Sequence, residues 1–208
     1  MRPLIVVCIA LFVSSIDVSA QSLSVSAVAM SADHELLGDP LIGASVGIRF
    51  ATHSGSKSLR LDVERLTGNA ERFGVPCGGF IAPDTCPQES VRDDARLSSA
   101  TAGMGFRLFA RRHAAVAVTA DLGVARIVVK TRGLSTGKTL NADKNMWSGL
   151  IGAEGTWTPL MRVPLVLHFG AGVGGLMPLR PEQVADGYTP FNRTIALSRA
   201  RLGIAFQL

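Results

Sequence analysis

Two glycine-rich segments have the residue types and nearly the spacing of nucleotide-binding loops. Gly133-Leu-Ser-Thr-Gly137-Lys138-Thr139 is one residue short of the phosphate-loop pattern G-x4-G-K-[ST], because position 132 is Arg. Gly170-Ala-Gly172-Val-Gly174-Gly175 contains G-x-G-x-x-G, but Pro178 follows where the dinucleotide motif requires a helix to begin. We therefore predict no nucleotide and no other cofactor. We interpret the first segment as a flexible loop and the second as glycines inside a strand.

His168 is the only histidine well inside a segment with the pattern of a strand, which makes it a candidate general base. General-base chemistry requires a proton donor within hydrogen-bond reach of the imidazole. The alternation of the segment puts His168 on its polar face, so we expect it to form hydrogen bonds inside the fold. No set of residues predicts a catalytic or a metal site, and we predict that the chain is not an enzyme.

The first 20 residues have the composition of a cleaved secretory signal peptide. Arg2 supplies a positive charge, and Leu4–Val13 is an apolar run too short to cross a bilayer as a helix. Val18-Ser19-Ala20 puts small residues at the usual cleavage positions. We therefore predict a signal peptide at 1–20 and a single domain at 21–208. A buried N-terminal strand or helix is the alternative.

Two cysteines remain after the expected cleavage, Cys77 and Cys86, in a segment rich in Gly and Pro. An even pair in an exported chain favours a disulfide. The short ring that it closes would stabilise the fold by about 2–3 kcal/mol. A Cys-x8-Cys metal clip is the alternative, but no His lies nearby.

The composition is apolar without long apolar runs. The sequence is 47% hydrophobic and contains 22 Gly, yet beyond the signal no stretch approaches the ~18 apolar residues of a transmembrane helix. The net charge of +5 comes from scattered residues. Together with export, this scatter argues against nucleic acid as a partner.

Period-two alternation explains where the apolar residues go, and it predicts β-strands. The first strand is the weakest, because Val28 and Met30 interrupt its pattern, and Arg126 interrupts the far end of the fifth, where a bulge could reset the phase. The predicted apolar faces are Leu23, Val25, Ala27 and Ala29; Ile42, Ala44, Val46, Ile48 and Phe50; Leu59, Leu61 and Val63; Ala100, Ala102, Met104, Phe106 and Leu108; Val116, Val118, Ala120, Leu122 and Val124; Trp147, Ile151, Ala153 and Trp157; Leu165, Leu167, Phe169, Ala171 and Val173; and Ala200, Leu202, Ile204, Phe206 and Leu208.

The connections between these segments alternate in length. Tight or short ones fall at 53–56, 111–113 and 159–164, and longer ones at 33–40, 68–94, 130–145 and 179–193. Outer-membrane barrels combine short periplasmic turns with longer external loops. The sequence therefore predicts an all-β protein, a transmembrane antiparallel up-and-down barrel of eight strands whose long loops, the disulfide included, lie outside the cell.

The two faces of the predicted strands differ in chemistry. The aliphatic face suits lipid, and Trp147 and Trp157 lie ten positions apart on it, roughly 25 Å along the membrane normal, which matches an apolar band with an aromatic girdle at each rim. The other face, rich in Gly, suits a crowded lumen. Its charged residues nearly balance: Arg49, Arg60, Asp62, Glu64, Arg107, Asp121, Glu154, Arg199 and Arg201.

The pattern resembles the small bacterial outer-membrane β-barrels of the OmpA-like or OmpX-like kind over nearly all of the mature chain. Its most specific part is the end, Ile204-x-Phe206-x-Leu208, because these families finish on an alternating strand with a terminal aromatic. This chain departs by ending on Leu208. The resemblance implies outer-membrane lipid and the barrel-assembly machinery as partners, with Ile204, Phe206 and Leu208 as the assembly signal.

Three functions remain open from the sequence. We favour a structural or surface-interaction role in the cell outer membrane, with a side-chain-filled lumen and external loops that bind an extracellular ligand still unknown. Eight strands enclose an interior that side chains fill, which argues against the alternative of a narrow pore for small solutes. Some relatives of this kind are lipid A-modifying enzymes with a His, a Ser and an acid, but the chain has no His-x-Ser-Asn motif, and His168 faces the lumen by the predicted phase.

Overall fold

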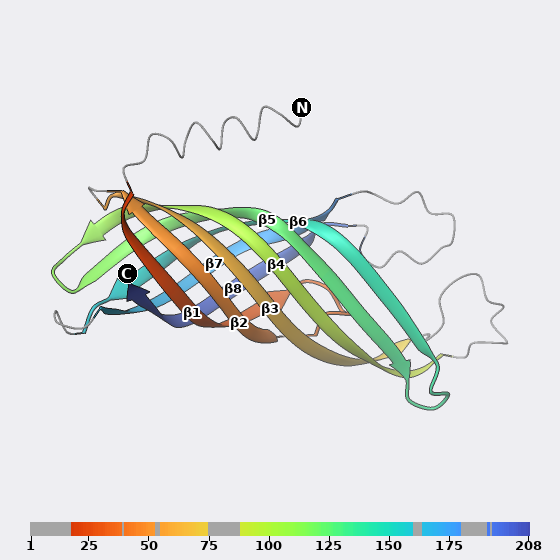
Figure 1. The fold of residues 1–208 in the computed structure, drawn as a ribbon. Coiled ribbons are helices and arrows are strands. Elements are labelled where there is room, and N and C mark those ends of the chain that lie inside the picture. Colours follow the sequence, from red (N-terminus) through yellow and green to blue (C-terminus); the bar gives the residue numbers. More distant parts are fainter. Residues whose placement is uncertain are drawn as a thin grey trace.

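A computed structural model describes residues 18–38, 40–52, 55–74, 88–159, 164–179, 191 and 193–208. It is a closed barrel in which each strand pairs antiparallel with the next and the first with the last (Figure 1). The predicted all-β class and the number of eight strands are confirmed. Within the described residues no helix is long and apolar enough to cross a membrane. The strands are β1 Val18–Ala32, β2 Leu41–Thr52, β3 Lys57–Gly74, β4 Glu89–Ala110, β5 Ala114–Gly133, β6 Thr139–Trp157, β7 Leu165–Pro178 and β8 Ile195–Gln207.

Strands β3 to β6 are longer than the sequence pattern predicts. They contain 18, 22, 20 and 19 residues, whereas the other four contain 12 to 15. The predicted loops at 68–94 and 130–145 are therefore wrong in their boundaries. β3 continues to Gly74, β4 begins at Glu89, and only 134–138 separates β5 from β6. The four long strands project beyond their neighbours at the end of the barrel opposite the tight 111–113 turn (Figure 1). We call this projecting part the outer extension.

The reason why the strand lengths were underestimated is seen in β4, where side chains alternate between buried and exposed without interruption from Glu89 to Phe106. Towards the 111–113 turn the exposed positions are apolar, as at Ala100 and Met104. Towards Glu89 the polarity inverts, so that Arg92 and Arg96 are exposed while Val91 and Leu97 are buried. A prediction based on a continuous apolar outward face therefore ends the strand too early, at the point where the outward residues change from apolar to polar.

A cluster of buried apolar side chains fills the barrel in its outer half, and we call it the outer plug. The segment between β1 and β2 folds into it, because Leu36 and Leu37 are fully enclosed. Val28 and Met30 also point into the plug, which explains why the first strand looked irregular. The members are Val28, Met30, Leu36, Leu37, Leu41, Leu66, Ala95, Leu97, Ala125, Ile127, Val129, Met146, Leu150, Leu176, Phe191, Ile195 and Leu197.

The sequence suggested a bulge near Arg126, at the far end of β5. Neither the pairing of β5 with β4 nor its pairing with β6 contains a bulge at that end. The pairing of β5 with β4 shifts only between Arg107 and Phe109, near the tight turn, and the pairing with β6 does not shift. Arg126 keeps the outward phase, and Ile127 and Val129 keep the inward one. At this point of β5 the outward residues change from apolar to charged, while the alternation of inward and outward positions continues unchanged.

Two predictions lie largely outside the described residues. Cys77 and Cys86 both do, so their disulfide stays a prediction. So do residues 1–17 of the expected signal peptide. β1 begins at Val18, three residues before the expected mature start at Gln21, and the signal peptide also stays a prediction.

Candidate functional site

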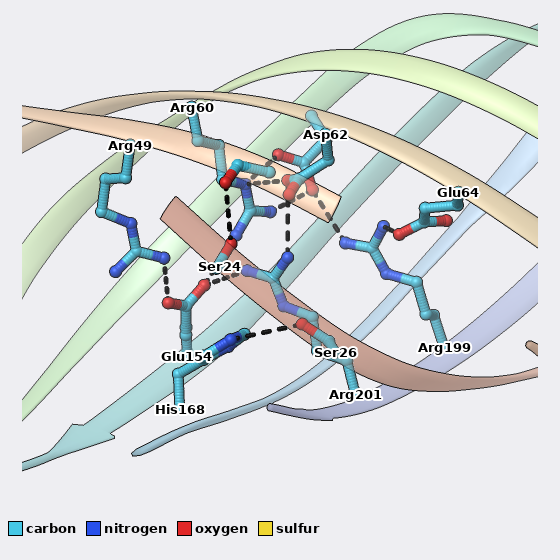
Figure 2. A network of polar contacts seen from close by, with 12 residues as sticks. Ser24, Ser26, Arg49, Arg60, Asp62, Glu64, Glu154, His168, Arg199 and Arg201 are labelled. Carbon is cyan, nitrogen blue, oxygen red and sulfur yellow. Dashed lines mark hydrogen bonds and ion pairs between the residues drawn. The ribbon is translucent and has the colours of Figure 1, made fainter. Parts of the chain in front are cut away.

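The inner half of the lumen contains a layer of ion-paired side chains contributed by several strands of the barrel (Figure 2). β3 supplies three consecutive inward positions, since Arg60, Asp62 and Glu64 are two residues apart in a strand. β5 supplies Asp121 and β6 supplies Glu154 from across the lumen. Most of these groups are buried. We call the full set the charged layer: Arg49, Arg60, Asp62, Glu64, Asp121, Glu154, Arg199 and Arg201.

Arg60 is the centre of the charged layer. Its Nε donates to Asp121 Oδ1 at 2.8 Å, and its Nη1 donates to Glu154 Oε2 at 2.7 Å. Nη2 donates to the second oxygen of Asp121. Asp62 lies 3.3 Å from Arg60 Nε as well. One guanidinium therefore joins carboxylates from β3, β5 and β6.

The remaining arginines complete the network. Arg199 Nη1 donates to Glu64 at 2.8 Å and Nη2 to Asp121 at 2.9 Å. Arg201 Nη1 donates to Asp62 at 3.4 Å and Nη2 to Glu154. Arg49, the one partly exposed member, also donates to Glu154. Four arginines thus face four carboxylates, so the layer is neutral, as burial of charge requires.

Arg107 does not join the charged layer, contrary to the prediction. The β4–β5 register shifts between Arg107 and Phe109, and this irregularity ends the regular inward series of β4. Arg107 is exposed at the end of the barrel, with its guanidinium beside Gly55. The other eight predicted lumen charges are brought together.

His168 lies beside the charged layer on β7. Its Nε2 is 3.2 Å from Ser26 Oγ on β1, and both side chains are buried (Figure 2). General-base chemistry requires at least a hydroxyl at hydrogen-bond distance from the imidazole, and this pair meets that one requirement. Among the described residues, however, His168 Nδ1 has no hydrogen-bond partner, so no acid orients the ring. The geometry is that of a hydrogen bond inside the lumen.

Glu89 is a buried carboxylate with a structural role that the sequence pattern did not predict. It begins β4 at the outer end, and its Oε2 accepts hydrogen bonds from the backbone N–H of Ser135 at 2.6 Å and of Thr136 at 3.0 Å. The Thr136 hydroxyl donates to Oε1. The hydrogen bond from Thr136, with help from the Ser135 amide, holds the pKa of the Glu89 carboxyl below its ordinary value. The turn that came close to a phosphate loop thus holds a carboxylate of its own chain.

A second missed group lies on the inner face of β3, β4 and β5, beyond the outer plug. Asp93 is fully buried, accepts a hydrogen bond from Arg72 Nε at 2.7 Å and another from the Thr131 hydroxyl. Strict alternation would have found Asp93, because it lies on the same face as Val91, Ala95 and Leu97. The prediction missed it because it assigned this stretch to a loop.

The outside of the barrel carries the predicted aromatic and aliphatic residues. Trp147 and Trp157 both point outward and are about half exposed. Ile204, Phe206 and Leu208 at the end of the chain also point outward. Their role as an assembly signal stays a prediction.

A closed antiparallel barrel with exposed aliphatic side chains on its outer wall and paired charges in its interior is a transmembrane β-barrel. No protein-family model matches the chain, and no curated protein sequence matches it. Solved structures do match its fold. A major outer membrane protein from Thermus thermophilus has a TM-score of 0.60 at 15% identity, covering 91% of this chain and 100% of that one.

Two further solved structures match to a similar degree. Neisserial surface protein A has a TM-score of 0.53 at 13% identity, with 91% and 99% of the two chains covered. The attachment invasion locus protein Ail of Yersinia pestis has a TM-score of 0.51 at 14% identity, with 91% and 97% covered. The chain therefore has the fold of the small bacterial outer-membrane barrels, which supports an outer-membrane location.

Proposed function

We propose that the chain is a non-conducting outer-membrane barrel that presents the outer extension at the cell surface as an interaction platform. The observation that carries the proposal is the double closure of the lumen. The charged layer lies in the inner half and the outer plug above it. The two closures exclude solutes by different means, and each extends across the barrel.

The charged layer supports the absence of a pore through its connectivity. Arg60, Arg199 and Arg201 each contact two or more carboxylates from different strands. A cavity beside them has a volume of about 10 Å³, which leaves room for roughly one water molecule. Opening this layer would separate several buried ion pairs at once, and each uncompensated buried charge is costly.

The outer extension supports the platform role through its outward surface. Polar and charged side chains make up most of this surface, and Glu89 holds the 134–138 turn at its tip through hydrogen bonds. The pair between Arg126 and Asp143 joins β5 to β6 on the outside, with Arg126 Nε at 2.9 Å from Asp143 Oδ1. Paired strands thus hold the surface residues in fixed relative positions. The proposed partner is extracellular, and no enzymatic activity is part of the proposal.

Planar-bilayer conductance of the refolded protein tests whether the charged layer and the outer plug close the lumen. We expect no steady channels above background from the intact chain. An Arg60→Ala/Arg201→Ala variant is expected to raise conductance, and a matched Arg92→Ala/Arg126→Ala variant, which removes two exterior arginines, is expected to leave it unchanged. Steady channels from the intact chain that persist after deletion of residues 75–87 would establish a narrow pore instead.

Cysteine labelling on intact cells tests the platform. In a Cys77→Ser/Cys86→Ser background, Asn141→Cys in the outer extension is expected to react with a membrane-impermeant maleimide. His113→Cys in the tight turn at the other end is the matched control and is expected to react only after lysis. The reverse pattern would place the outer extension in the periplasm and would refute the platform.

A further inference from the structure

Charged side chains on the outside of the barrel above the apolar band are confined to one side. They belong to β3, β4, β5 and β6, whereas the described residues of β7, β8, β1 and β2 present no charged side chain outward. The group contains six cations and three acids: Arg65, Arg92, Arg96, Arg126, Lys130, Arg132, Glu71, Asp94 and Asp143. This surface of the outer extension therefore carries a net positive charge.

Three of these arginines surround Ser98. In the register of the sheet, Ser98 on β4 lies opposite Arg65 on β3 and opposite Arg126 on β5. Arg96 is the next outward position along β4. Neighbouring strands are about 4.8 Å apart and alternate residues of a strand about 6.6 Å apart, so three cations originate within about 7 Å of one hydroxyl. We call them the arginine triad.

Two members of the triad have no counter-ion among the residues that the structure describes. Arg126 is held by Asp143, and Asp94 is in an ion pair with Arg92, at 3.5 Å. Within the described part of the chain, Arg65 and Arg96 have no ion-pair partner and are exposed. Guanidinium groups in such an arrangement match a phosphate in charge and in hydrogen-bond geometry.

The row directly below the triad is apolar. Ala100 on β4 pairs with Val63 on β3 and with Val124 on β5, and Val124 pairs with Trp147 on β6. Val63 is among the most exposed apolar side chains of the molecule. One outward position along β3 and β5, and two along β4, therefore separate the lipid-facing wall from the arginine triad. An amphiphile with an anionic head group has the matching arrangement of apolar and charged parts.

We propose that the arginine triad binds the phosphate of an anionic outer-leaflet lipid whose acyl chains lie against β3, β4 and β5. The inference rests on the orientation given under the proposed function, because that orientation puts the triad at the outer surface. A soluble polyanion is the less suitable occupant, because among the described residues only Arg65 and Arg96 are unpaired cations at this level, and because such a ligand would leave the adjoining apolar wall unused.

Native mass spectrometry of the refolded protein in neutral detergent tests the proposal with diphosphorylated lipid A and its dephosphorylated form as probes. We expect the intact chain to bind the phosphorylated form more tightly. Arg65→Gln/Arg96→Gln is expected to weaken that binding by about thirtyfold, because both unpaired cations are lost. Lys130→Gln/Arg132→Gln removes the same charge from the same face, further from the apolar band, and is expected to change binding less than about threefold. Heat-modifiable gel migration checks that every variant is folded.

Three outcomes would overturn the proposal. Equal weakening in both double variants would mean that net charge alone attracts the lipid. Equal binding of both lipid forms would mean that the phosphate is not recognised. Binding of soluble sucrose octasulfate with the same dependence on Arg65 and Arg96 would make the triad a polyanion site. Binding in detergent does not depend on conductance or membrane orientation, so the result of this test is distinguishable from the results of the conductance and labelling tests of the proposed function.

Discussion

The inner and outer halves of the barrel use the same alternation with opposite polarity. Between Trp157 and Trp147 the aliphatic residues point outward and the charges inward. Beyond Trp147 the aliphatic residues point mainly inward and most of the charges outward, although Arg72, Glu89 and Asp93 lie on the inner face. β4 crosses both halves without a change of phase until Arg107. The comparison shows that strand geometry fixes which side chains share a face, and that the surrounding medium decides which face is apolar.

The two halves should therefore respond in opposite ways to the same kind of substitution. The inner half resembles a membrane barrel, whose interior tolerates charge only in pairs. The outer half resembles a soluble barrel, whose interior is an apolar core. Substitutions matched between the two halves can break or sharpen this contrast.

Arg60→Met is expected to have the largest effect, because it leaves Asp121 and Glu154 without their central partner. Loss of one partner from a buried ion-pair network destabilises by about 3–5 kcal/mol. Reversible urea unfolding in lipid vesicles measures the free energy. Arg126→Met, which breaks an exposed pair in the outer extension, is the control and is expected to change stability little. An equal loss of unfolding free energy in the two variants would contradict the proposed difference between the inner and the outer half.

Ile127→Ala tests the outer plug. Ile127 is fully buried, and truncation of a buried isoleucine costs about 2–5 kcal/mol. Val128→Ala changes the next residue of the same strand, which points outward, and should cost much less. The same urea titration measures both, and a larger loss for Val128→Ala would reverse the assigned faces.

Leu122→Arg tests the lipid-facing wall. Leu122 is 73% exposed on the outside of β5, within the apolar band, where an arginine costs up to about 2–4 kcal/mol. Asn141→Arg introduces the same side chain on the outward face of the outer extension and is expected to be nearly neutral. If Leu122→Arg folded as stably as Asn141→Arg, this part of the wall would not lie in lipid.

Glu89 should give the smallest effect, confined to the tip of the outer extension. Because folding lowers its pKa, its contribution is present above the ordinary carboxyl pKa and is lost as the pH falls through the lowered value. Hydrogen exchange at the Ser135 and Thr136 amides should therefore lose protection at acid pH in the intact chain. Glu89→Gln should remove this pH dependence, and its persistence would mean that another group titrates.

The sequence alone predicts the inner half well. The eight strands, their outward aliphatic faces and eight of the nine lumen charges follow from alternation, because a lipid-facing wall makes the pattern strong. Arg107 was placed wrongly because a local shift of register leaves no signal in residue types. That shift lies between Arg107 and Phe109.

The outer half could not be predicted in the same way, because the prediction assumes that the outward face of every strand is apolar along its whole length. Val28 and Met30 looked like interruptions, and they are the inward apolar residues of the plug. Glu89 and Asp93 fell in a stretch assigned to a loop, although Val91, Asp93, Ala95 and Leu97 continue the same phase. The inversion becomes visible in the sequence once the change of medium beyond Trp147 is taken into account.

Accessibility along the outward face of β4 tests the inversion most directly. Nitroxide labels at Arg92, Arg96, Ala100 and Met104, one per variant, can be examined in lipid vesicles by electron paramagnetic resonance with oxygen and a water-soluble nickel complex as relaxing agents. We predict that oxygen dominates at positions 100 and 104 and the nickel complex at 92 and 96, with the crossover between 96 and 100. A uniform response along the strand, or a crossover elsewhere, would contradict the two-half account.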